Sequence, residues 1–193
     1  MGNIVDSFRI ILGQQKKLNY HFPNILRPPA TSQDIVRTER SLSLSFNSEL
    51  RELYSVADGT DIDDVTPCGL TGLIPIHNFL SLEDATRYYY ESMEFPDSFH
   101  NLTRDFRPED QLFPFLEDGA GNCYWVDLNE GTSDYSRIFW TNTFGTDPDY
   151  TYESLTDMFA IIAKAYLNGI IFVSEDGYLD CDFDAFDKLS NTK

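Results

Sequence analysis

A repeat of apolar residues every three or four positions predicts helices in the first third of the chain. It predicts a first helix over residues 3–17, followed by a proline-containing linker over 19–30. Side chains that can cap a helix stand at 31–32 and again at 47–48, so we expect a second and a third helix to begin there. Gly59 is suited to end the third helix, because glycine adopts the left-handed conformation common after a helix.

Further along, shorter apolar segments separated by turn residues predict an antiparallel sheet. The segments are 111–116, 123–128 and 135–140, and the turns between them are 117–122 and 129–131. Consecutive strands joined by short turns form an antiparallel meander. N-terminal helices, a central antiparallel β-meander and a C-terminal helix packed on the sheet indicate an α+β fold.

Other segments complete the expected order of elements. We expect a strand over 70–76, a short helix capped by Ser81, and an ordered loop over 92–110. Apolar residues at helical spacing predict the last helix over 152–168. A short strand near 170–173 and an acidic tail are expected to close the chain.

The charge of the chain bears on its partners. Of its 193 residues, 32 are acidic and 14 are basic, which gives a formal net charge of −18. Such a surface repels nucleic-acid phosphates and anionic membranes, so we expect neither as a partner. It attracts basic proteins and speeds their association, although the same charge could serve solubility alone. Hydrophobic residues make up 41% of the chain, which is enough for one sizeable core.

The cysteines and the N-terminus bear on the compartment. Cys68, Cys123 and Cys181 are odd in number, and none belongs to a C-x-x-C pair. This pattern argues against a disulfide framework or a zinc ribbon and favours buried free thiols in a reducing compartment. No basic segment followed by an apolar run begins the sequence, and the longest apolar stretches are too short to span a bilayer. We therefore expect a cytoplasmic protein.

Enzyme motifs are missing from the sequence. It contains no phosphate-binding loop, dinucleotide-binding fingerprint, zinc-protease helix or nucleophile elbow. Its three histidines lie far apart along the chain, so the sequence does not group them into a metal site or a catalytic triad. We therefore expect no catalytic residue and no cofactor.

One acidic segment, residues 180–184, opens like a calcium-binding loop. Ala185 stands where that loop needs glycine for a sharp turn, and Asn191 stands where it needs a bidentate glutamate. We therefore expect no metal here. The alternating pattern predicts instead an extended segment, with Cys181 and Phe183 facing inward and the aspartates facing solvent.

Several short motifs occur in an order that is informative as a whole. They are Pro28-Pro29-Ala30-Thr31, Leu44-Ser45-Phe46-Asn47, Leu53-Tyr54, Ala57-Asp58-Gly59, Ile74-Pro75, Phe79-Leu80-Ser81-Leu82-Glu83, Phe113-Pro114-Phe115, Asp118-Gly119-Ala120-Gly121-Asn122 and Val126-Asp127-Leu128. In order and spacing they resemble the SUKH superfamily, which includes fungal cell-wall-assembly regulators and many bacterial immunity proteins. The chain departs from that pattern at Phe46-Asn47, which replaces a proline, and at Asp58-Gly59, which replaces Asn-Gly.

The resemblance implies an α+β domain without catalysis. It places a single SUKH-like domain at residues 28–193 and leaves 1–27 as an N-terminal helix and linker whose packing it does not define. It also implies structural roles for the motif glycines and for Asp127, whose carboxylate would bond at the end of a strand. In bacteria, proteins of this kind commonly neutralise a toxin, often a nuclease, by covering its active surface.

We therefore expect a non-catalytic immunity protein that binds a basic toxin domain through an acidic surface. The expected contacts are acidic loop residues, namely Asp58, Asp61, Asp63, Asp64, Glu117, Asp118, Asp147 and Asp149. Taken singly, each of them could also be a solvated loop carboxylate. One alternative is a regulatory scaffold like the fungal regulators. The other is a hydrolase with a carboxylate pair, which no motif in the sequence supports.

Overall fold

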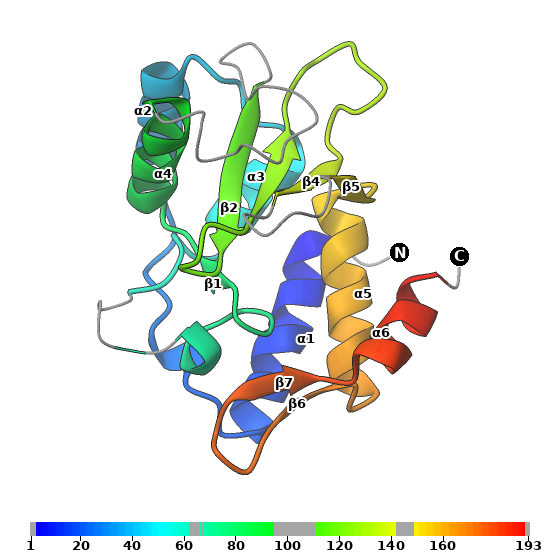
Figure 1. The fold of residues 1–193 in the computed structure, drawn as a ribbon. Coiled ribbons are helices and arrows are strands. Elements are labelled where there is room, and N and C mark those ends of the chain that lie inside the picture. The colour runs from blue at the N-terminus through cyan, green and yellow to red at the C-terminus, as the bar shows by residue number, and fades with distance from the viewer. Residues whose placement is uncertain (1–2, 62–65, 67, 95–110, 142–148, 192–193) are drawn as a thin grey trace.

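The computed structural model describes residues 3–61, 66, 68–94, 111–141 and 149–191. Its helices are α1 (Ile4–Lys17), α2 (Ser32–Leu42), α3 (Ser48–Tyr54), α4 (Leu82–Glu94), α5 (Leu155–Leu167) and α6 (Phe183–Ser190), with short 3-10 turns η1 (Phe22–Asn24) and η2 (Cys68–Leu70). Its strands are β1 (Asn78–Phe79), β2 (Leu112–Glu117), β3 (Cys123–Asp127), β4 (Ile138–Thr141), β5 (Asp149–Tyr152), β6 (Ile171–Val173) and β7 (Leu179–Cys181) (Figure 1). Within these ranges, no helix is long and apolar enough to cross a membrane.

Five strands form one antiparallel sheet in the order β1-β2-β3-β4-β5, so each strand pairs with its neighbour in sequence. The register pairs Phe113 with Val126 and Val126 with Ile138. β6 and β7 form a separate hairpin after α5. The α+β fold and the central meander are confirmed, whereas the edge strands β1 and β5 were not predicted at their positions.

Polar side chains cap the helices. The Asn3 side-chain oxygen accepts a hydrogen bond from the N–H of Asp6 at 2.8 Å. Thr31 and Asp34 form a reciprocal capping box at the start of α2, where a cap at 31–32 was predicted. Asn47 caps α3 through its side-chain oxygen. A cap of this kind contributes about 1 kcal/mol to stability, because it satisfies a helix N–H that otherwise has no partner.

The main core lies between the sheet and the helices α1, α3 and α5. Phe8 of α1 is fully buried and meets Phe79 of β1 and Phe159 of α5 edge to face, with ring centroids 6.1 and 5.7 Å apart. Tyr54 of α3 meets Phe113 of β2 in the same core. Helices α1 and α5 run side by side (Figure 1). The first helix, whose packing the sequence left undefined, is therefore part of the core.

Helix α4 packs on the opposite face of the sheet. The ring of Tyr88 lies 5.7 Å from the ring of Trp125, which is fully buried in β3. Trp125 and Val126 are adjacent in β3 and therefore point to opposite faces. Phe113, the cross-strand partner of Val126, shares the face of α1 and α3. Helix α2 packs beside α4 (Figure 1).

The strand predicted over 70–76 is wrong. The segment begins in the 3-10 turn η2 and continues as a tight turn, in which the N–H of Leu73 donates to the carbonyl of His77 at 2.8 Å. The proline within this turn has no N–H to give to a strand ladder. Pairing with the sheet therefore starts later, at Asn78 in β1.

The third helix is shorter than predicted, and Gly59 does not end it. Helix α3 ends at Tyr54, with Ser55 as its C-cap in a right-handed conformation. Gly59 lies beyond the helix end with a φ of +71°. Its positive φ belongs to the loop that packs against the start of α4, and it has no part in the end of α3.

Three boundaries later in the chain also differ from the prediction. Strand β4 begins at Ile138 rather than at 135, because a turn precedes it. Residues 149–152 form β5, and α5, the helix predicted over 152–168, begins after its cap, Ser154. Helix α4 extends over 92–94, the start of the expected loop, and the rest of that loop lies outside the described residues.

The C-terminal residues form a strand and a helix instead of the predicted acidic tail. Strand β7 pairs with β6, and Asp182 caps α6 by accepting a hydrogen bond from the N–H of Ala185 at 3.0 Å. Because the chain turns from strand to helix here, the inward orientation predicted for Phe183 is wrong, and its side chain is 67% exposed. Cys181 is buried and free, as expected, and so is Cys123.

Candidate protein-binding site

A pocket of about 210 Å³ lies between α4 and the sheet edge formed by β1 and β2. Its lining contains three carboxylates, one arginine and one tyrosine. The lining residues are Thr60, Phe79, Leu80, Asp84, Arg87, Tyr88, Glu91 and Glu117. Asp84, Tyr88 and Glu91 are four and three positions apart, so they lie on one face of α4 and reach the same pocket.

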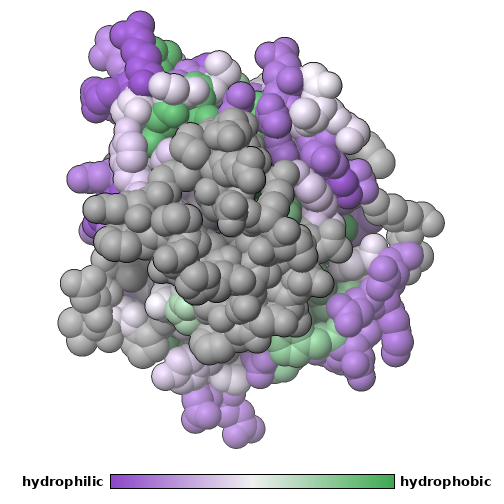
Figure 2. Space-filling view, turned by 45° about the horizontal axis from the view of Figure 1, so that its top comes forward, coloured by the Kyte–Doolittle hydropathy of each residue, from purple (hydrophilic) through white to green (hydrophobic). Residues whose placement is uncertain are grey.

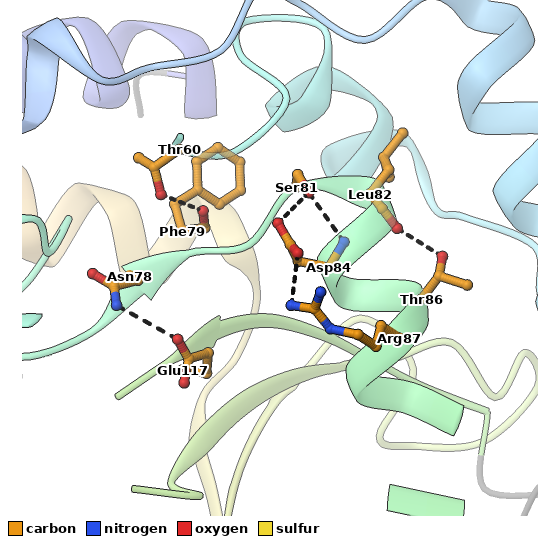
Figure 3. A network of polar contacts seen from close by, with 9 residues as sticks. All are labelled: Thr60, Asn78, Phe79, Ser81, Leu82, Asp84, Thr86, Arg87 and Glu117. Atoms are coloured by element: carbon orange, nitrogen blue, oxygen red, sulfur yellow. Dashed lines mark hydrogen bonds and ion pairs between the residues drawn. The ribbon is translucent and has the colours of Figure 1, made fainter. Parts of the chain in front are cut away.

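The first turn of α4 is held by two carboxylates. The hydroxyl of Ser81 accepts a hydrogen bond from the N–H of Asp84 at 3.0 Å and donates to its carboxylate at 2.6 Å (Figure 3). Asp58, from the loop after α3, accepts from the N–H of Leu82 at 2.8 Å. Both negative charges are favourable here, because the N-terminus of a helix carries a partial positive charge. Arg87 pairs with Asp84 at 2.8 Å.

Glu117 stands at the end of β2 on the wall opposite Asp84. One of its oxygens accepts a hydrogen bond from the N–H of Gly119. The other accepts from the side-chain amide of Asn78 at 3.5 Å (Figure 3). Burial raises the pKa of Glu117, and the neighbouring charges of Asp118 and Asp84 raise it further against the effect of these hydrogen bonds. Asp84, Glu91 and Glu117 all line the pocket, and the arginine of its lining pairs with only one of these carboxylates, that of Asp84.

Asp118 organises the turn between β2 and β3. One of its carboxylate oxygens accepts hydrogen bonds from the N–H groups of Ala120 and Asn122, at 2.8 and 2.9 Å. This is an Asx-type turn, in which the side chain replaces a backbone partner. The carboxylate is half-buried, and its charge contributes to the field around Glu117.

The structure brings together some of the predicted contact residues. Asp58, Glu117 and Asp118 surround the first turn of α4 and the adjoining sheet edge, and the exposed Asp61 follows Thr60, which lines the pocket. Asp149 does not join them, because β5 is the opposite edge of the sheet. Asp63, Asp64 and Asp147 lie outside the described residues.

Sequence reasoning missed two carboxylates of the pocket, Asp84 and Glu91. Asp84 belongs to the cap that Ser81 was expected to form, since its N–H donates to the Ser81 hydroxyl. The spacing of Asp84, Tyr88 and Glu91 was the available signal, since it places all three on one helix face. The sequence does not show which face of that helix turns toward the sheet edge.

A glutamine at position 117 is expected to raise stability near neutral pH. The raised pKa of Glu117 means that the folded state binds its proton more readily than the unfolded chain does. That stabilisation is present in full below the ordinary pKa of 4.5 and is lost as the pH rises through the raised pKa. Glu117→Gln keeps the shape and an acceptor oxygen without the charge, so we expect a gain of up to about 1 kcal/mol near pH 7, or roughly 2–4 °C in Tm.

Calorimetry of both proteins between about pH 4 and pH 7.5 tests this expectation. The two should unfold at similar temperatures at the acid end and diverge as the pH rises. A variant that is less stable at every pH would show that the charged hydrogen bond to Gly119 outweighs the cost of burial.

Comparison with models of known protein families identifies the family of this chain. The family model described as SMI1 / KNR4 family (SUKH-1) matches residues 29–161. The chain belongs to the SUKH-1 family. A search of curated proteins finds no match. The SUKH-1 match includes α2 to α4, the five-stranded sheet and the first part of α5, and therefore every residue that lines the acidic pocket. Helix α1 and the C-terminal hairpin with α6 lie outside the match.

SUKH-1 domains are generally non-catalytic binding domains. In the pocket, both oxygens of Glu117 accept hydrogen bonds from the polypeptide, and Asp84 is held by Ser81 and Arg87. Among the described residues, no three or more histidine, cysteine, aspartate or glutamate side chains group in a way that could hold a metal ion. The motif residue Asp127 has the structural role implied by the resemblance, since it accepts hydrogen bonds from the N–H of Asn129 and the hydroxyl of Tyr150.

Proposed function

We propose that this SUKH-1 protein is an immunity protein, which neutralises a basic toxin domain by binding it through an acidic surface. The observation that carries the proposal is the pocket beside α4, where Asp84, Glu91 and Glu117 converge with a single arginine that is already paired. Figure 2 shows that hydrophilic residues cover much of the described surface on one side of the molecule. A nuclease toxin is the best fit, because a protein that binds phosphate presents a basic surface.

The proposed contact residues divide into two kinds. Asp58, Glu117 and Asp118 hold the loops and the start of α4 in place, and they contribute charge to the surface from those fixed positions. Glu91 lines the pocket and Asp61 follows the lining residue Thr60; both are exposed and can approach a partner's cations. The remaining expected contacts, Asp63, Asp64, Asp147 and Asp149, stay part of the proposal.

The first experiment is affinity capture from the source organism with the full chain as bait, at low and at high salt. A single basic toxin domain, retained at low salt and released at high salt, supports both the immunity function and its electrostatic mechanism. Recovery of cell-wall or signalling enzymes instead supports a regulatory scaffold, the alternative function within the same family. Retention that does not depend on salt contradicts the acidic-surface mechanism.

A pair of charge-neutralising variants tests the location of the surface. Asp61→Asn with Glu91→Gln is expected to slow association with the captured partner several-fold at low salt, with little effect on dissociation, because rim charges act mainly on the encounter rate. The matched control is Glu130→Gln with Glu175→Gln, which removes the same charge from exposed positions away from the pocket. Equal slowing in both variants would mean that net charge matters and the pocket does not.

A further inference from the structure

A second pocket, of about 380 Å³, lies where the C-terminal hairpin and α6 meet the sheet. Aromatic rings form much of its wall, with Tyr124 and Tyr152 from the sheet and Phe183 and Phe186 from α6. Figure 1 places α6 and the β6-β7 hairpin beside the lower part of α5. The wall formed by the hairpin and α6 lies outside the SUKH-1 match, so this chain adds the pocket to the family domain.

One buried polar atom beside this pocket has no partner. His77 lines the pocket and is only 8% exposed. Its Nδ1 lies 3.0 Å from the carbonyl oxygen of Pro75, so Nδ1 carries the proton and donates to it. The other ring nitrogen, Nε2, is then an acceptor, and it has no hydrogen-bond partner among the described residues. Burial lowers the pKa of His77 despite the Pro75 carbonyl and the charge of Asp118, which keeps the ring neutral near pH 7.

Carboxylates and apolar side chains lie together at the opening. Asp180 and Asp187 line the pocket and are exposed. Phe183 and Ile76 line it as well, with 67% and 51% of their surfaces exposed. Exposed apolar groups surrounded by charge are typical of an interaction site, whose centre is apolar and whose rim is polar.

We propose that this pocket is a second contact site for the basic partner and that it receives an arginine side chain. A guanidinium group is planar and stacks on aromatic rings, which Tyr124, Tyr152 and Phe183 supply. It carries five N–H donors and can therefore serve Nε2 of His77 and a carboxylate of the rim together. Lysine lacks the planar group, and tryptophan has a single donor and no charge for Asp180 and Asp187 to complement.

The identity of the occupant rests on the proposed function, in which the partner is basic, whereas the preference of the pocket for a guanidinium does not. A capped Gly-Arg-Gly peptide is therefore the probe, titrated into the isotopically labelled full chain and followed by amide NMR shifts. Saturable binding in the millimolar range is expected, with shifts centred on α6 and on the segment around His77. Absence of saturable binding overturns the proposal.

Three peptides of the same length test which property of arginine is recognised. Citrulline keeps the planar shape but lacks the charge, and a carbonyl oxygen replaces one of the NH2 groups of arginine. It is therefore expected to bind at least about five-fold more weakly. Lysine and tryptophan peptides are also expected to bind more weakly than arginine. Citrulline binding equal to arginine, or tryptophan binding more tightly, overturns the assignment of the occupant.

Substitutions locate the binding to this pocket. Phe183→Ala and Asp187→Asn change exposed side chains, so both variants should fold, and each is expected to weaken arginine binding by about two- to five-fold. Phe172→Ala is the control, because Phe172 is also an exposed aromatic residue of the hairpin but does not line the pocket. An equal loss in the control overturns the location.

The two proposals fail separately. If the peptide does not bind but a basic toxin is captured, the immunity function stands without this contact site. If the peptide binds at the pocket but no basic protein is captured, the guanidinium site stands and its natural occupant is not the proposed partner.

Discussion

Replacement of Gly59 by alanine is expected to destabilise the protein by about 4 kcal/mol or more, a large part of the 5–15 kcal/mol that stabilises a typical domain. Gly59 has a φ of +71°, which costs an alanine about 1–2 kcal/mol. A Cβ at this position would lie 2.2 Å from the backbone nitrogen of Ser81 and 2.5 Å from the carbonyl carbon of Leu80. Those atoms belong to the backbone that leads into α4, so they cannot move aside as a flexible side chain could.

The clash of the added Cβ can be separated from the backbone strain of the positive φ with a second variant, Gly177→Ala. Gly177 also has a positive φ, +85°, but a Cβ there would meet nothing within 4 Å. Only the backbone strain should remain, about 1–2 kcal/mol. Urea unfolding of both variants measures the difference. Similar losses at the two positions would show that the approach of Gly59 to α4 is looser than the structure has it.

The same close approach explains how the acidic pocket is positioned. The N–H of Thr60, next to Gly59, donates to the carbonyl of Phe79 at 3.0 Å. Asp58, on the other side, accepts from the first turn of α4. The glycine thus lets the loop after α3 lie flat against the start of α4, with one carboxylate and one pocket wall in place. The Asp-Gly pair therefore supports the site through the side chain of Asp58 and the backbone of Gly59.

Local signals in the sequence predicted the parts of the fold that are determined locally. The capping residues Thr31 and Asn47 marked the starts of two helices, because they satisfy N–H groups within a few residues of themselves. The meander strands were visible because Gly119 and Gly131 interrupt runs of apolar residues, and both glycines do have positive φ. These features depend on neighbours in the sequence and are therefore readable from it.

Features decided by distant contacts were not readable in the same way. The helix at Phe183 is a separate case, because its signal is local: Asp182 caps α6 through the N–H of Ala185, and the alternating pattern of residues 180–184 obscured that cap. The candidate site shows the limit that distant contacts set. Glu117 and Asp118 were recognised as acidic turn residues, but Glu91 joins them only because α4 packs on the sheet beside β2. The position of Asp149 on the opposite edge follows from the strand order, which the sequence pattern does not contain.

Replacement of Phe8 by alanine is expected to cost about 3–5 kcal/mol, the usual range for a fully buried phenylalanine. Phe8 has no exposed surface, and its ring contacts Phe79 of the sheet and Phe159 of α5 edge to face. The substitution would leave a cavity where three elements meet. Small rearrangements cannot fill it, because protein interiors are closely packed.

The control on the same helix is Ile10→Ala, since Ile10 is 39% exposed and should lose less than about 1 kcal/mol. Urea unfolding of both variants, with the native chain beside them, distinguishes two arrangements of α1. If only Phe8→Ala is strongly destabilising, α1 belongs to the cooperative core although it precedes the SUKH-1 match. If both losses are small, α1 is an appendage that can leave without unfolding the sheet. The first result is expected, because Phe8 contacts both the sheet and α5 in one shared core.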